Sequence, residues 1–146
     1  MTVPELCKEY IDSKAGIAKD STIANYTALL RNHIEPRFGC IDAYELTSES
    51  ISDYYKSLVF KGFSEVHIHA IGILLKSAYN YADVKYGMEN PCKKAFMPKM
   101  RKKMITVLTE EEKSIVLKHG DTAAKIALSM GLRIGEICGI MEQDIE

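Results

Sequence analysis

The chain has 146 residues, a mass of 16.4 kDa and a net charge of −1, with 47% hydrophobic and 27% charged residues. This composition is ordinary for a globular protein and argues against an intrinsically disordered chain. No apolar run approaches the roughly 20 residues that cross a bilayer. The N-terminal segment MTVPELCKEYIDSK lacks the basic start and apolar core of a signal peptide. We therefore expect a cytoplasmic protein with no membrane partner.

The charge is distributed unevenly along the chain. Residues 1–107 contain 15 Lys and Arg against 12 Asp and Glu, whereas residues 108–146 contain 4 against 8. The segment KKAFMPKMRKK, Lys93 to Lys103, has six basic residues and no acid. Such asymmetry indicates a polyanion bound by one part of the chain, although a solvated linker explains the composition equally well.

The cysteines and histidines give no sign of a metal site. The cysteines lie far apart and form no C-x-x-C pair: Cys7, Cys40, Cys92 and Cys138. Free, mostly buried thiols in a reducing compartment are the simplest interpretation. A zinc site made from these and the four histidines has no support in their spacing, and we expect neither metal nor cofactor.

Two helices are predicted in the first 40 residues. Val3, Leu6 and Tyr10 have helical spacing, and Pro4 suits the first turn. The second helix covers STIANYTALLRNHI, with an N-cap at Asp20 or Ser21 and with Pro36 just beyond its end.

Two more helices follow before residue 92. The third covers SESISDYYKSLVFKG, capped by Thr47 or Ser48 and ended by Gly62. The fourth, EVHIHAIGILLKSAYNYADVKYG, is capped by Ser64 and closed by Gly87. Its apolar positions predict a buried stripe of Ile68, Ile71, Leu75, Ala78 and Ala82. The opposite face carries Glu65, His69, Gly72, Lys76, Asn80 and Asp83. A glycine inside a helix costs roughly 0.5–1 kcal/mol relative to alanine, so Gly72 indicates that another body approaches there.

The chain starts a new unit after Pro98. Thr109 and the acids that follow it predict a capped helix, TAAKIALSM predicts a second that ends at Gly131, and a third covers about Ile134 to Met141. Residues 108–146 are 39 residues long. A chain shorter than about 40 residues rarely folds without help, so this segment looks like the start of a larger domain. The whole chain is therefore predicted to be all-α.

Within this last part, the segment GLRIGE places Arg133 among apolar residues. A buried or half-buried arginine is costly unless it has an anionic partner. Glu136 would lie on the same helical face. The residues alone leave open whether this pair is structural or serves an outside anion.

Several segments, in this order, resemble the tyrosine recombinases, the phage-type integrases: STIANYTALLRNHIEPRFG, ELTSESISDYYKSL, LLKSAYNYA, ENP, LTEEE and ALSMGLRIGEICGI. The resemblance implies a four-helix SAM-like core-binding domain over 1–92 and a basic interdomain linker over 93–107. Residues 108–146 would be a short helical stub, the N-terminal part of a truncated catalytic domain.

By this resemblance, Arg133 is the first of two arginines that clamp the scissile DNA phosphate, and Glu136 holds the site in place. A guanidinium offers paired donors to phosphate oxygens and stabilises the charge that builds in the transition state. The family's lysine, histidines, second arginine and nucleophilic tyrosine would come after Glu146. We therefore expect the chain to be inactive by itself.

The resemblance also implies that the second and fourth helices face the major groove of double-stranded DNA and that the linker runs along the duplex. The predicted DNA-contacting residues are Lys19, Asn25, Arg31, His69, Lys76, Asn80, Lys99, Arg101, Lys102 and Lys103.

The leading hypothesis is a DNA-binding fragment of a site-specific recombinase from a phage or mobile element. Its parent would break and rejoin DNA through a phosphotyrosine intermediate, together with other protomers on DNA. One alternative is a naturally short, non-catalytic DNA-binding regulator. Another is a helical protein–protein interaction module, which salt-dependent DNA affinity would exclude.

Overall fold

A computed structural model describes residues 1–99 and 106–141, and all regular secondary structure in that part of the chain is helical. Outside the helices, the described residues contain one isolated antiparallel bridge, between Thr2 and Asp42. The predicted all-α class is confirmed. None of the described helices combines the length and apolar content that crossing a membrane requires. The chain divides into two compact units, Met1–Lys102 and Lys103–Glu146.

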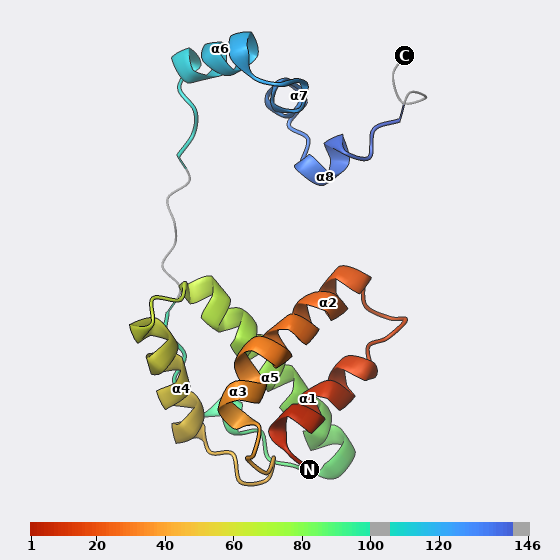
Figure 1. Ribbon diagram of the computed structural model, residues 1–146, viewed down its shortest axis with the longest axis vertical. Helices are drawn as coiled ribbons and strands as arrows, with labels where there is room; N and C mark the ends of the chain where they lie inside the picture. The colour runs from red at the N-terminus through yellow and green to blue at the C-terminus, as the bar shows by residue number, and fades with distance from the viewer. Residues whose placement is uncertain (100–105, 142–146) are drawn as a thin grey trace. The chain divides into compact units, whose positions relative to one another are not determined.

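The first unit is built from four helical rods (Figure 1). They are α1 (Val3–Asp12), a long rod of α2 (Asp20–Leu29), η1 (Leu30–Ile34) and α3 (Glu35–Phe38), then α4 (Ser48–Phe60) and α5 (Glu65–Tyr86). The Thr47 and Ser64 side chains cap α4 and α5, and Gly87 ends α5 with a φ of 67°, as predicted. The cap predicted for α2 is wrong: Lys19 holds that position and has no side-chain hydrogen bond to the helix.

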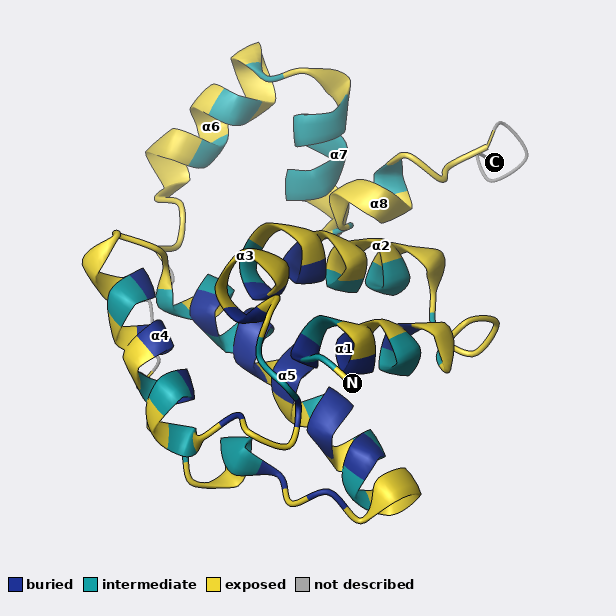
Figure 2. Ribbon diagram, turned by 60° about the horizontal axis from the view of Figure 1, so that its bottom comes forward, coloured by how far each residue is buried: buried dark blue, intermediate teal, exposed yellow. Residues whose placement is uncertain are grey.

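The core of this unit forms around α5, whose inner side is dark blue in Figure 2. The predicted stripe is fully buried: Ile68, Ile71, Leu75, Ala78 and Ala82 each have 0% of their surface exposed. Phe38 at the end of α3 and Val3 and Leu6 on α1 are fully buried as well. The apolar spacing of α5 therefore fixes which way this helix faces.

The second rod continues past the point at which the sequence predicts its end. Pro36 lies in the first turn of α3, inside the rod and not beyond it. Proline lacks the N–H of a regular helical turn, and its ring clashes with the carbonyl four residues earlier. The rod widens into the π-helical turn Leu30–Ile34 just before Pro36, where the Glu35 N–H donates to the Leu30 carbonyl. This wider turn accommodates the proline, and the rod carries Phe38 into the core.

Gly72 does not lie on the exposed face of α5, contrary to prediction, because it is buried. A Cβ atom at Gly72 would lie 2.1 Å from Cε of Met97 and 3.0 Å from the Tyr55 hydroxyl. The body that approaches this glycine is therefore part of the same chain. The backbone N–H of Phe96 also donates to Oγ of Ser52 on α4 at 2.9 Å.

The first residues of the predicted linker are thus packed on the first unit. The segment that follows η2 (Pro91–Lys93) contributes Ala95 and Met97 to the edge of the core. The division at residues 92 and 107 stays a prediction.

The second unit contains three short helices, α6 (Glu110–His119), α7 (Thr122–Met130) and α8 (Ile134–Ile137). Thr109 and Glu112 form the predicted capping box of α6, and Gly131 ends α7 with a φ of 70°. Helix α8 is shorter than predicted, since it ends at Ile137. None of residues 106–141 is buried, and in Figure 2 these helices are teal and yellow throughout.

Replacing Gly72 with alanine should release the segment around Met97 while leaving the helical core folded. The added methyl group displaces the Met97 side chain, but alanine also raises helix propensity by up to about 1 kcal/mol. We expect faster trypsin cleavage after Lys94 and Lys99, with little change in the melting temperature. Mass spectrometry of timed digests gives the cleavage rates.

Two variants test this assignment. Met97→Ala should release the same segment, and the double variant should be cleaved no faster than either single variant, because the two changes remove one contact. Gly135→Ala has open space around its Cβ position and serves as the control. Wild-type cleavage rates in Gly72→Ala would refute the assignment.

Candidate nucleic-acid interface

Helices α2 and α5 enclose a shallow hollow of about 300 Å³ on the surface of the first unit. It is lined by Ser21, Thr22, Asn25 and Tyr26 of α2 and by Ala70 and Ile73 of α5. The predicted contact residue Asn25 is exposed in this hollow. Side-chain groups of two helices that are far apart in sequence therefore meet on one surface.

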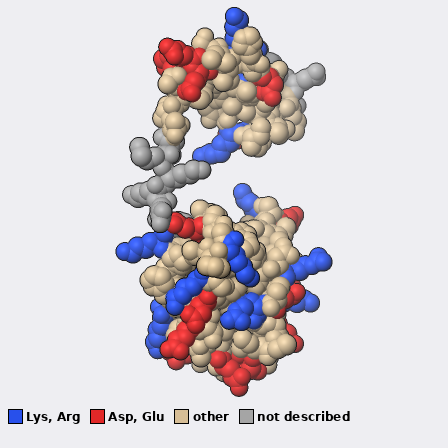
Figure 3. Space-filling model, turned by 60° about the vertical axis from the view of Figure 1, so that its left-hand side comes forward, with Lys and Arg blue, Asp and Glu red and all other residues tan. Residues whose placement is uncertain are grey.

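Three predicted cations lie on the same two rods. Lys19 precedes α2, Arg31 lies in η1 and Lys76 lies one turn after Ile73 on α5; all three are exposed. None of the three has an ion pair with another described residue. Figure 3 shows cationic side chains spread over this unit, with acidic side chains concentrated toward its lower end. Exposed, unpaired cations are available to an outside anion.

Two other predicted contact residues have partners inside the protein. Nε2 of His69 lies 2.7 Å from the carbonyl oxygen of Pro98. The side-chain oxygen of Asn80 accepts a hydrogen bond of 2.7 Å from Nδ2 of Asn90, which is 1% exposed. His69 and Asn80 thus hold residues 90–98 against α5, and DNA contact by them stays a prediction.

The basic segment is only partly available. Lys93 pairs with Asp83 at 3.1 Å and Lys94 pairs with Glu89 at 2.9 Å. Lys99 is exposed and has no ion pair in the described part of the chain. Arg101, Lys102 and Lys103 lie outside the described residues.

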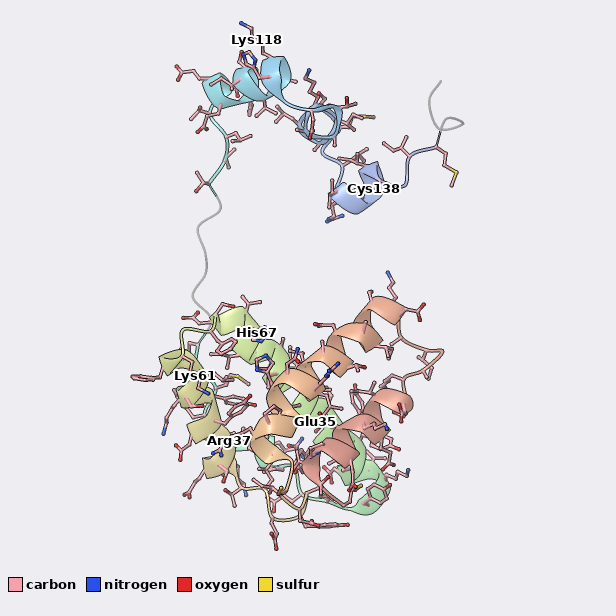
Figure 4. The ribbon with its side chains drawn as sticks, in the orientation of Figure 1. Glu35, Arg37, Lys61, His67, Lys118 and Cys138 are labelled. Carbon is pink, nitrogen blue, oxygen red and sulfur yellow. The ribbon has the colours of Figure 1, made fainter. Side chains whose placement is uncertain are left out.

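A histidine pair, which the sequence did not reveal, joins the two rods. Nε2 of His33 lies 2.8 Å from Nε2 of His67, and Phe63 stacks on His67 and meets His33 edge-on. Figure 4 labels His67 near the N-terminal end of α5. The π-helical turn before Pro36 carries His33, and the Tyr54 hydroxyl donates to the His33 carbonyl at 2.9 Å. Burial lowers the pKa of His33, and the nearby His67 lowers it further.

The predicted phosphate ligand lies in the second unit. Arg133 immediately precedes α8, and the backbone N–H of Arg133 donates to a carboxylate oxygen of Glu136 at 2.7 Å. The guanidinium lies 3.6 Å from the other Glu136 oxygen, yet 87% of the arginine side chain is exposed. Glu136 therefore caps the helix through the backbone and holds the guanidinium only loosely. The catalytic role of both residues stays a prediction.

The described residues contain no group of three or more His, Cys, Asp or Glu that could hold a metal ion.

Comparison with known proteins identifies the class. Residues 2–59 match the phage integrase N-terminal SAM-like domain. The chain is 33% identical over 142 residues to a XerC-like tyrosine recombinase from Caldanaerobacter subterraneus subsp. tengcongensis, covering 88% of this chain and 36% of that protein. The chain thus belongs to the tyrosine recombinase family.

Solved structures share the fold. The Tn1549 transposon integrase in complex with transposon right end DNA matches with a TM-score of 0.82 at 24% identity, over 100% of this chain and 50% of that one. The same integrase in complex with circular intermediate DNA matches with a TM-score of 0.79 at 22% identity, over 100% of this chain and 51% of that one. The chain spans about a third of the curated relative and half of the solved integrase chains.

The histidine pair predicts a stability that falls in mild acid. A histidine with a lowered pKa in the folded state binds protons less readily than in the unfolded state, so its stabilisation is complete above pH 6.5 and decreases below it. As the pH is lowered below 6.5, the melting temperature of the wild type should fall more steeply than that of His33→Gln. Thermal unfolding followed by circular dichroism gives both slopes.

The matched control is His119→Gln, which changes an exposed histidine of the second unit and should keep the wild-type slope. Equal slopes for the wild type and His33→Gln would show that the pair does not contribute.

Proposed function

We propose that the chain is the DNA-binding part of a site-specific tyrosine recombinase of a mobile element. The observation that carries the proposal is the surface shared by α2 and α5, where a hollow with exposed polar groups is accompanied by cations that have no ion pair with another described residue. Cations supply sequence-independent affinity for phosphates, and amide and hydroxyl groups suit base edges. The related integrase structures, whose chains are bound to DNA, support this assignment.

The second unit fits the beginning of a catalytic domain. Its described residues leave apolar side chains exposed, including Ile115 at 60% and Ile134 at 69%, so the helices require further partners to bury them. Arg133 would bind the scissile phosphate, because its guanidinium is accessible and always charged. Glu136 would orient it. In the complete recombinase, other protomers on the same DNA would be further partners.

Four of the tyrosine hydroxyls of this chain already donate hydrogen bonds within the protein. All eight precede residue 87, in the first unit. The Tyr54 and Tyr79 hydroxyls donate to backbone carbonyls, and burial raises the pKa of Tyr54 to about 12. The Tyr81 and Tyr86 hydroxyls donate to Glu9. Breaking and rejoining of DNA strands is therefore assigned to the complete recombinase.

The basic segment should supply much of the DNA affinity. Each phosphate neutralised on duplex DNA adds roughly 0.9 to the slope of log affinity against log salt, so four cations contribute up to about 3.6. Changing Lys99, Arg101, Lys102 and Lys103 together to alanine should weaken binding to all duplexes alike and flatten this slope. Fluorescence anisotropy titrations over a series of salt concentrations measure both.

The control is Lys93→Ala with Lys94→Ala, whose cations are already paired with acids and should change the slope less. An unchanged slope in the quadruple variant would make the segment a simple tether. If the wild type shows no salt-dependent affinity for any duplex, the DNA-binding proposal fails and a protein–protein module is favoured.

The 146-residue chain alone should form no covalent link to DNA. We expect incubation with nicked suicide duplexes to give no complex that survives denaturing electrophoresis, because every tyrosine belongs to the first unit whereas Arg133 and Glu136 belong to the second. A denaturation-resistant adduct that peptide mapping places on one of these tyrosines would overturn this division of roles.

A further inference from the structure

The polar side chains in the hollow between α2 and α5 differ from several others of this unit in their hydrogen bonds. Elsewhere in this unit, Thr27, Ser52 and Ser57 donate to carbonyls of their own helices. The side chains of Ser21, Thr22 and Asn25 make no hydrogen bond to any described residue, although all three line the hollow. Their donors and acceptors are therefore available to a molecule that enters it.

The opposite wall of the hollow is apolar. Ile73 is 53% exposed, although most residues around it on α5 are buried or polar, and Ala70 lies one turn before it. No charged side chain lines the hollow; Asp20 and Lys19 adjoin it at the start of α2, and Lys76 follows Ile73 on α5. The hollow thus offers a methyl-rich surface beside an amide, with Lys19 and Lys76 and one acid, Asp20, at its margins.

This combination matches one feature of double-stranded DNA. In the major groove, thymine presents a 5-methyl group beside its O4 acceptor, and adenine presents an N6 donor and an N7 acceptor that a carboxamide can bind together. A guanine–cytosine pair has no methyl group, and its N7 and O6 acceptors favour arginine or lysine. The minor groove shows no methyl group from either pair.

Resting on the proposed DNA-binding function, we propose that this hollow recognises an A·T base pair in the major groove. Ile73 packs against the thymine methyl group, and the Asn25 carboxamide accepts from adenine N6 and donates to N7. Lys19 and Lys76 contact the phosphates on either side. Ile73 and Asn25 are then specificity-determining residues contributed by different helices.

The test removes the methyl group from the DNA and the apolar group from the protein. A duplex site is first selected from a random pool with the full chain, and each thymine in it is then replaced by deoxyuridine. Losing one buried methyl group corresponds to a decrease in affinity of about fourfold. We expect this decrease when deoxyuridine replaces the one thymine that Ile73 contacts, and no decrease at the other thymines. Asn25→Ala should weaken binding to the selected site roughly 5- to 150-fold, the range for a bidentate contact with adenine.

Ile73→Ala should bind the thymine and deoxyuridine duplexes equally, because the partner of the methyl group is gone. Val84→Ala is the matched control, since Val84 lies on the same helix, is 91% exposed and does not line the hollow; it should keep the fourfold preference. Circular dichroism verifies that each variant folds.

The possible failures are distinguishable. No affinity for any duplex would refute the proposed function itself. Duplex binding with equal affinity for thymine and deoxyuridine at every position, or an undiminished preference in Ile73→Ala, would overturn the assignment of the hollow while leaving DNA binding intact.

Discussion

Burial of one face of α5 is the constraint on which the first unit depends. Five residues at helical spacing on this helix are completely removed from solvent, and the other rods pack around them. Eight of the 22 residues of α5 are buried, and the exposed residues Ile73, Lys76 and Asn80 form a strip at helical spacing on the side that faces solvent. Because α2 crosses beside that strip (Figure 1), the strip and the exposed side of α2 become one continuous surface.

Hydrogen bonds within the protein decide which polar residues on this surface remain available. His69 and Asn80 lie on the exposed side of α5, but both hold the segment that leaves the helix and returns along it. The side chains of Asn25 and Lys76 have no such partner among the described residues. Exposure on a helix face is thus a poor guide to binding, because a side chain already bonded to its own protein offers less to a partner.

The features that could be predicted from the sequence are those that depend on residues close together in the chain. The caps at Thr47, Ser64 and Thr109 and the stripe of α5 follow from hydrogen-bonding side chains and helical spacing, which act over a few residues. The features that it missed depend on contacts between distant segments. Gly72 faces Met97, and His33 meets His67, and no local pattern pairs such residues. The widened turn before Pro36 has a local cause, but the continuation of the rod depends on the burial of Phe38.

The lack of internal hydrogen bonds at the side chains of Ser21, Thr22 and Asn25 affects how this surface can evolve. Since their side chains make no hydrogen bond to any described residue, each can be replaced without breaking a helix cap or an internal hydrogen bond. Mutation can therefore explore new combinations at these positions at little cost in folding. Descendants of one ancestral chain could acquire different partners in small steps on an unchanged helical framework.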